Sequence, residues 1–142
     1  MDKSIQSRSP QGFQEVEHTA DWELVVWAAD LPGLIEQAAR GMYSLAGINL
    51  EGGSQIERSV IIRAIDSESI LVGFLQELLF LAETEGIGFH GFELHLQQEE
   101  LSARLTGAKI ASINKEIKAV TFHNLLIEKY QDGLEARIVF DV

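Results

Sequence analysis

The amino-acid sequence predicts a single α+β domain in which largely antiparallel, mixed sheets pack against two main helices. Three observations lead to this fold class: several runs of β-branched or alternating residues, two long runs with apolar residues at helical spacing, and a bunching of the predicted strands near the end of the chain. The resulting order, β-β-α-β-α-β-β-β-β, differs from the regular alternation of a doubly wound α/β fold. We expect residues 1–10 to form a flexible leader and residues 11–142 to form the domain.

Two strands and a helix are predicted in the first third of the chain. Residues 13–16 and 22–28 are rich in aromatic and β-branched side chains, which favour strands. The helix that follows begins after Asp30, a residue type suited to a helix N-cap, and has Pro32 in its first turn. Its apolar side chains recur at three- and four-residue spacing to about residue 45, and Gly47 predicts its end.

The middle of the chain predicts a loop at 49–55, a strand at 57–64 and a second, stronger helix. Asp66 with Ser67 is suited to cap this helix, which extends to about residue 85 and ends at Gly86. Its apolar face is so wide that it must lie against a sheet. The clean alternation in residues 92–97 and 101–106 then predicts an antiparallel hairpin with one buried face.

The last part of the chain predicts a second hairpin, connected to the first by residues 107–115. Its strands are residues 119–130 and 135–142, and the turn between them contains Asp132-Gly133, a strong hairpin signal. Chain ends usually fray. Here we expect the final strand to be docked, so that Asp141 and the α-carboxylate of Val142 lie side by side at fixed positions and attract a cation.

Composition excludes several classes of function. The chain contains no cysteine, which excludes disulfides, thiolate metal sites and cysteine nucleophiles. We find no signal sequence and no apolar run near the roughly 20 residues of a membrane helix, so we expect a cytoplasmic protein without membrane contact. The net charge of −11, from 22 acidic and 11 basic residues, disfavours stable direct binding of nucleic acid. Neither a G-x-S-x-G elbow nor a phosphate-binding loop is present, so the sequence indicates an accessory protein and not an enzyme.

Two aspartates are the candidates for a binding site. Asp21 lies at a corner between strands, where an aspartate commonly serves as a hydrogen-bond acceptor in a turn. Asp141 follows an apolar run, where a carboxylate is costly to desolvate without a partner. If the two meet, their carboxylates and the terminal carboxylate or a backbone carbonyl at Val142 suit a hard cation such as calcium, magnesium or manganese. A zinc site made by His18, Asp21 and His123 is the alternative.

The remaining lysine and histidine candidates are expected to be solvent-exposed side chains. Lys109, Lys115 and Lys118 form a modest basic run, which we expect to be a solvated edge that blunts strand pairing. Contact with a partner is the alternative role for this run. His90 and His95 are expected on exposed faces.

Five sequence blocks, in order and covering nearly the whole chain beyond the leader, resemble the archease family. The blocks are His18-Thr-Ala-Asp21, Ala38-Ala-Arg-Gly-Met-Tyr43, Phe74-Leu-Gln-Glu-Leu-Leu-Phe-Leu-Ala-Glu-Thr-Glu-Gly86, Ile117-Lys-Ala-Val-Thr-Phe-His-Asn124 and Glu135-Ala-Arg-Ile-Val-Phe-Asp141-Val142.

This resemblance implies an activator of an RtcB-type RNA ligase, the enzyme that joins RNA ends bearing a 2′,3′-cyclic phosphate or 3′-phosphate to a 5′-hydroxyl in tRNA splicing and RNA repair. Members of the family promote guanylylation of the catalytic histidine of the ligase and allow multiple turnovers. The resemblance also implies a metal site at Asp21, Asp141 and Val142. It further implies that Lys118 contacts the ligase or its nucleotide.

Two departures from the family pattern bear on this site. The family often has a small pair of residues where this chain has Trp22-Glu23, which is expected to change the surface that faces the partner. The chain also has Phe122-His123-Asn124 in place of Tyr-His-Asp, and Asn124 offers a carbonyl oxygen but no charge. Two other functions stay open: a chaperone or general adaptor, and a metal-dependent hydrolase with His18 as its base.

Overall fold

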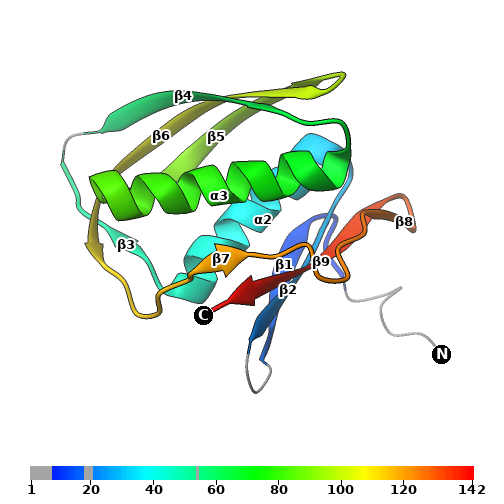
Figure 1. The fold of residues 1–142 in the computed structure, drawn as a ribbon, viewed down its shortest axis with the longest axis horizontal. Coiled ribbons are helices and arrows are strands. Elements are labelled where there is room, and N and C mark those ends of the chain that lie inside the picture. The colour runs from blue at the N-terminus through cyan, green and yellow to red at the C-terminus, as the bar shows by residue number, and fades with distance from the viewer. Residues whose placement is uncertain (1–7, 18–20, 54) are drawn as a thin grey trace.

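Two antiparallel sheets pack against two helices in the computed structural model, which describes residues 8–17, 21–53 and 55–142 (Figure 1). The first sheet has the order β1-β2-β9-β7, and β8 also pairs with β9. Its strands are β1 (Gly12–Glu17), β2 (Trp22–Ala28), β7 (Ala119–Val120), β8 (Glu128–Tyr130) and β9 (Gly133–Asp141).

The second sheet is built around β6, which pairs with β3, β4 and β5. Its strands are β3 (Asn49–Leu50), β4 (Ile56–Arg63), β5 (Ile87–Gln97) and β6 (Glu100–Ser112). All strand pairs in the described part of the chain are antiparallel. The predicted α+β class with two main helices and largely antiparallel sheets is therefore confirmed.

Both helices begin and end at the residues that their capping signals predicted. Helix α2 (Leu31–Ala46) begins after Asp30, whose Oδ1 accepts the Gly33 N–H at 2.9 Å, and ends at Gly47 in the left-handed conformation. Helix α3 (Ser67–Glu85) begins after Asp66 and ends at Gly86, with a φ of 66°. An L side chain rarely adopts this conformation, so glycine is the suited stop at both ends.

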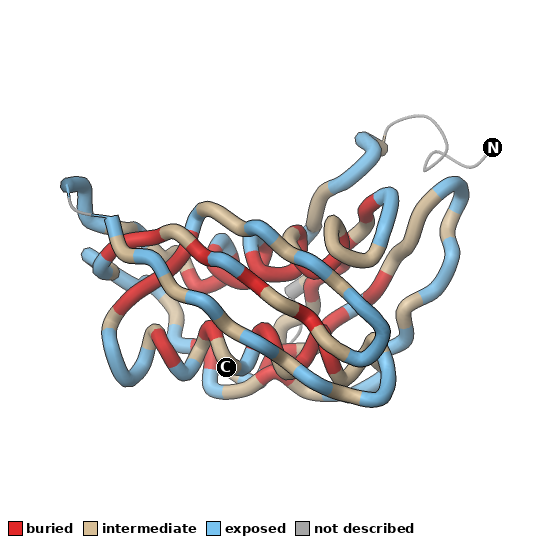
Figure 2. Tube along the Cα trace, turned by 90° about the horizontal axis from the view of Figure 1, so that it is seen from above, coloured by how far each residue is buried: buried red, intermediate tan, exposed pale blue. Residues whose placement is uncertain are grey.

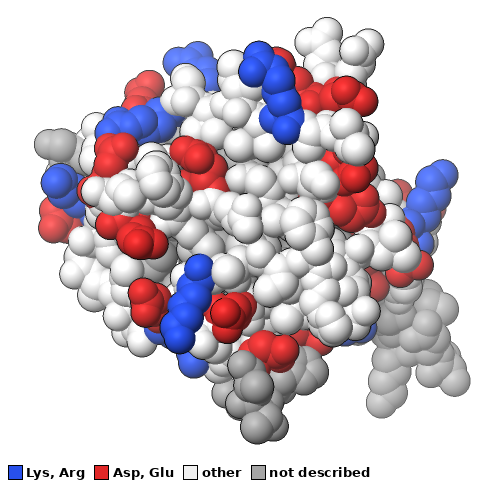
Figure 3. Space-filling model, in the orientation of Figure 1, with Lys and Arg blue, Asp and Glu red and all other residues white. Residues whose placement is uncertain are grey.

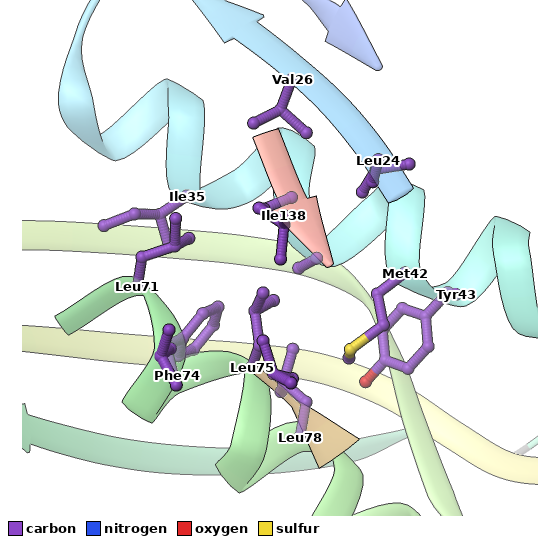
Figure 4. Close-up of a cluster of buried hydrophobic side chains, with 14 of the residues drawn as sticks. Leu24, Val26, Ile35, Met42, Tyr43, Leu71, Phe74, Leu75, Leu78 and Ile138 are labelled. Carbon is purple, nitrogen blue, oxygen red and sulfur yellow. The ribbon is translucent and has the colours of Figure 1, made fainter. Parts of the chain in front are cut away.

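The core lies where the helices face the two sheets (Figure 2). Helix α2 contacts β1, β2 and β9 of the first sheet and β5 of the second, whereas α3 contacts β4, β5 and β6 together with β7. Figure 4 shows side chains from both helices and from the first sheet meeting in one cluster, among them Leu24, Ile138, Ile35, Phe74 and Leu75. In the part of the chain that the structure describes, neither helix has the length and apolar character needed to cross a membrane.

The hairpin of the second sheet is longer than predicted. Strand β5 begins at Ile87, and β6 continues to Ser112 through residues that were expected to form a connection. The expected loop at 49–55 also contains the short strand β3, which pairs with this extension of β6. Glycines explain the misprediction, because a Cβ at Gly107 would lie 1.8 Å from the carbonyl oxygen of Gly88. Glycine here permits close backbone approach and does not mark a loop.

The predicted strand at 119–130 is wrong as one element. It forms β7 and β8, and residues 121–127 between them leave the sheet. A turn closed by the Leu125 N–H and the Phe122 carbonyl interrupts the strand, and Asn124 inside it has a φ of 54°. The hairpin turn itself is confirmed, because Tyr130 pairs with Gly133.

The N-terminal leader is described only from Arg8, because residues 1–7 lie outside the described residues. The Arg8 guanidinium lies 3.9 Å from the ring centre of Trp27 and forms a 2.6 Å ion pair with Glu135. The backbone carbonyl of Ser9 accepts a hydrogen bond from the Trp27 indole at 2.9 Å. These contacts attach residues 8 and 9 to the outer side of the first sheet.

Candidate metal corner at the end of the first sheet

The pairing of β2 with β9 brings the two candidate aspartates to the same end of the first sheet. Trp22, the first residue of β2, is the register partner of Phe140. Asp21 directly precedes this pair on one strand, and Asp141 directly follows it on the other. Continuation of the antiparallel register therefore places Asp21 opposite Asp141, and directly opposed residues lie within side-chain reach of one another.

Strand β7 lies on the other side of Asp141. Ala119 is the register partner of Asp141, and the Lys118 N–H donates a 2.8 Å hydrogen bond to the Asp141 carbonyl. The last residues of β9 are thus held between β2 and β7, at the C-terminus shown in Figure 1. This arrangement agrees with the expectation that the final strand is docked, and it places Lys118 next to Val142.

Burial of the flanking residues fixes the corner, whereas its ligand groups stay accessible. Phe140 is fully buried, and its ring anchors the end of β9 in the core. Asp141 is exposed, and Asp21 and Val142 are half-buried. No described lysine, arginine or histidine side chain forms an ion pair with either aspartate. Two neighbouring carboxylates without a basic side-chain partner leave negative charge that a cation can neutralise.

The donor chemistry of this corner fits a hard divalent cation. Carboxylate oxygens from Asp21 and Asp141 and a main-chain oxygen of Val142 are ligands that calcium, magnesium and manganese accept. The described residues contain no group of three or more His, Cys, Asp and Glu side chains that could hold a metal ion. The set therefore depends on the main-chain oxygen as its third protein donor, with water completing the coordination shell.

The described residues include only one of the two imidazoles of the zinc alternative, so this alternative stays a prediction. His18 lies outside the described residues. His123 is exposed in the segment between β7 and β8, with its Nε2 3.2 Å from Nδ2 of Asn124. Because the neighbouring Thr121 N–H donates to the Val139 carbonyl at 3.0 Å, the chain at this point has already moved past Asp141 along β9. His90 and His95 are exposed, as expected.

Trp22 at the corner contacts Lys115, which the amino-acid sequence did not predict. The Lys115 Nζ lies 4.4 Å from the centre of the Trp22 ring, a cation–π contact. The backbone N–H of Lys115 also donates to the Ala46 carbonyl at 2.9 Å. Lys115 is therefore half-buried rather than part of a solvated edge, whereas Lys109 and Lys118 are exposed. Trp22 supplies the aromatic half of this contact.

The large hollows on the surface lie away from the corner. One of about 610 Å³ is lined by residues of the β4–α3 and β5–β6 connections, and another of about 520 Å³ lies on the outer side of the first sheet. Neither is lined by Asp21 or Asp141. Asp141 is exposed at the corner, where a large partner can contact it.

Comparisons with known proteins identify the fold and the family. Residues 13–142 match the model of the Archease protein family (MTH1598/TM1083). The archease of Methanosarcina mazei is 31% identical over 139 residues, which cover 92% of this chain and 95% of the relative. The archease of Methanothermobacter thermautotrophicus is also 31% identical, with coverage of 93% and 99%.

Two solved structures have the same fold. The crystal structure of a Thermotoga maritima protein, described as an archease and possible chaperone, superposes with a TM-score of 0.68 at 25% identity, over 91% of this chain and 96% of that one. The solution structure of Methanobacterium thermoautotrophicum protein 1598 gives 0.69 at 27% identity, over 92% and 99%. On the family match and this shared fold, the chain belongs to the archease family.

Proposed function

We propose that this archease-family chain is an accessory protein that activates an RtcB-type RNA ligase by means of a divalent cation held at the metal corner. The observation that carries the proposal is the pairing of Trp22 with Phe140, because it brings Asp21 beside Asp141 from opposite ends of the chain. The support from relatives is the family membership together with the residue blocks that contain both aspartates.

The chain's own residues position and present the ligand oxygens. Burial of Phe140 and the hydrogen bond from Lys118 hold Asp141 in place, so little order has to be gained when a cation binds. The cation would supply charge neutralisation for phosphate oxygens, which guanylylation of a histidine in the ligase requires. Lys118, exposed beside Val142, is available to contact phosphate or the ligase. The corner lies on an open surface, so a partner can reach it directly.

A time course of ligase guanylylation tests this proposal. Purified ligase, GTP and a divalent cation are combined with the wild-type chain, with Asp141→Ala, or with Asp132→Ala as a matched control. Asp132 is an exposed aspartate in the turn at the opposite end of β9. We expect the wild type and Asp132→Ala to accelerate guanylylation and Asp141→Ala to have no effect. Full stimulation by a folded Asp141→Ala variant would contradict the metal-corner mechanism.

A chaperone or general adaptor is the second candidate function. Exposed apolar side chains on this chain and the description of the Thermotoga maritima relative as a possible chaperone favour it. The measurement is light scattering of unrelated aggregating proteins with and without the chain. Suppression of aggregation for several clients, unchanged in Asp141→Ala, is the result that this second function predicts.

A further inference from the structure

One side of the molecule exposes large apolar side chains on two neighbouring segments. Phe80 on α3 is 57% exposed, and Phe122 and Leu126, between β7 and β8, are each 56% exposed. Single exposed apolar residues are common on protein surfaces, whereas a contiguous group marks a contact surface. These three side chains are the largest exposed apolar groups on the two segments.

Two hydrogen bonds show that α3 and the 121–127 segment run side by side. Gln76 Nε2 on α3 donates to the Val120 carbonyl at 3.4 Å, just before the segment begins. At its other end, the Ile127 N–H donates to Oε2 of Glu68 at 3.0 Å. Phe80 lies one helical turn beyond Gln76, on the same side of α3 but past the start of the segment, so it extends this surface toward the C-terminal end of the helix. We call Phe80, Gln76, Phe122 and Leu126 the α3 face.

The segment is held in a defined conformation, so the exposure of its side chains is not fraying. Leu125 and Ile127 pack against the core, and Leu126 between them is left outside. The Leu125 N–H donates to the Phe122 carbonyl at 3.0 Å, and Thr121 bonds to the Val139 carbonyl of β9. Apolar side chains presented on a fixed backbone lose little conformational entropy when they are covered by a partner.

The charges around the α3 face are predominantly acidic. Helix α3 carries Glu68, Glu77, Glu83 and Glu85 and no basic residue. Acidic side chains in a last helical turn are unfavourable, because the helix dipole is negative there; Glu85 is offset by Arg58 at 2.6 Å, and Glu83 is exposed. Figure 3 shows this side of the molecule with a broad uncharged centre, at whose margin acidic side chains outnumber the basic ones.

The α3 face adjoins the metal corner through β7. Val120 accepts the hydrogen bond from Gln76, and its neighbour Ala119 pairs with Asp141. A protein that covers the α3 face would therefore also lie against the corner. Docking and activation can in this way use one continuous surface.

We propose that the α3 face docks a protein partner whose contact surface is apolar at its centre and rich in lysine and arginine at its rim. A second copy of this chain is the poorer occupant, because it would bring another net charge of −11 to the contact. Aromatic side chains at the centre of a polar rim are the usual composition of a protein interface. The inference rests on the proposed function, in which the RNA ligase is this partner.

Binding measurements with uncharged substitutions test the docking surface. The double variant Phe122→Gln/Leu126→Gln removes apolar contact without a change of charge, and Ile65→Gln is the matched control, because Ile65 is 84% exposed in the β4–α3 connection. Affinity for the ligase is measured by calorimetry at two salt concentrations, and circular dichroism checks folding. We expect the double variant to bind about tenfold more weakly or worse and Ile65→Gln to bind as the wild type does. Wild-type affinity should fall with added salt.

Separate outcomes distinguish the failure of this inference from the failure of the proposed function. The inference is overturned if the double variant binds and activates the ligase as the wild type does, while Asp141→Ala binds without activating. It is also overturned if light scattering shows that the double variant changes only self-association. If the wild-type chain neither binds nor activates the ligase, the proposed function fails and the inference falls with it.

Discussion

The two sheets of this protein differ in how far apart in the sequence their central pairings lie. In the second sheet, β5 and β6 form a hairpin in which Gln97 pairs with Glu100, and Glu100 also forms an ion pair with Arg63 of β4 at 3.0 Å. In the first sheet, Trp22 pairs with Phe140, and only this long-range pairing brings Asp21 to Asp141. The candidate site therefore depends on tertiary structure, whereas the central β5–β6 hairpin of the second sheet follows from local sequence pattern.

Among the variants proposed, alanine substitutions in the central strand of each sheet should cause the largest loss of stability. Phe140 in β9 and Leu105 in β6 are both essentially fully buried. Replacement of Phe140 should lower the free energy of unfolding by about 3–5 kcal/mol, and replacement of Leu105 by about 2–5 kcal/mol, because each leaves a cavity in the core. Urea denaturation followed by circular dichroism measures both losses.

The same two variants should respond differently to a divalent cation. Binding to the folded state raises stability by mass action. Leu105→Ala leaves the end of β9 intact and should keep the rise in the urea midpoint on addition of cation, whereas Phe140→Ala loosens the metal corner and should lose it. Equal rises in the two variants would show that the corner does not depend on the anchoring of β9.

Tyr43 on α2 offers a smaller test, in the shared core between the sheets (Figure 4). Its buried hydroxyl has no hydrogen-bond partner in the described part of the chain. Removal of an unsatisfied buried polar group is neutral or stabilising, so Tyr43→Phe should raise the free energy of unfolding by about 0–1 kcal/mol in urea. A loss of more than that would reveal an interaction of the hydroxyl that the structure does not show.

The same variant should change the response to alkaline pH. Burial raises the pKa of the Tyr43 phenol, and the neighbouring backbone of Phe89 offsets only part of this rise without completing a hydrogen bond. A raised pKa in the folded state means that stability is fully present below the unfolded pKa, near 10, and is lost as the pH rises above it. Between pH 8 and about 11, the midpoint temperature of thermal denaturation should fall less steeply in Tyr43→Phe than in the wild type.

Substitution of Asp66, the N-cap of α3, should have the smallest effect on stability. It tests the helix that packs against the second sheet. Its Oδ1 accepts the Ser69 N–H at 2.7 Å, and this bond lowers the pKa of the carboxyl. A lowered pKa contributes stability above the unfolded pKa, which is lost as the pH falls through the folded pKa. The Asp66→Asn variant keeps an acceptor oxygen and does not titrate. As the pH is lowered from 6 to about 2, its midpoint temperature of thermal denaturation should therefore fall less than that of the wild type. An unchanged acid dependence would contradict this role.

The helices could be predicted from the sequence because their signals are local. Asp30 with Gly47 and Asp66 with Gly86 mark the ends of α2 and α3 within a residue of their observed bounds. The hairpin turn was predicted from Asp132-Gly133 for the same reason, although Gly133 is already the first residue of β9. Each of these features depends on side chains and backbone groups only a few residues apart.

The remaining structure depends on contacts that no local pattern specifies. Glycines at 88 and 107 lie in paired strands, where they permit close backbone approach, although their residue type suggested a connection. The exposed Phe122 and Leu126 were predicted to belong to one continuous strand, and their position became clear only from the contact of their segment with α3. For the metal corner, the sequence named Asp21 and Asp141, and the adjacency of the two follows from the register of β2 with β9.

A double-mutant cycle on cation affinity tests the central claim most directly. Calcium or manganese is titrated by calorimetry into the wild type, Asp21→Asn, Asp141→Asn and the double variant, with Asp132→Asn as the control. If both aspartates hold one ion, each single variant should lose at least about tenfold in affinity, and the double variant should lose less than the sum of the two effects. Wild-type affinity in either single variant, or strictly additive losses, would contradict a shared cation between the two ends of the chain.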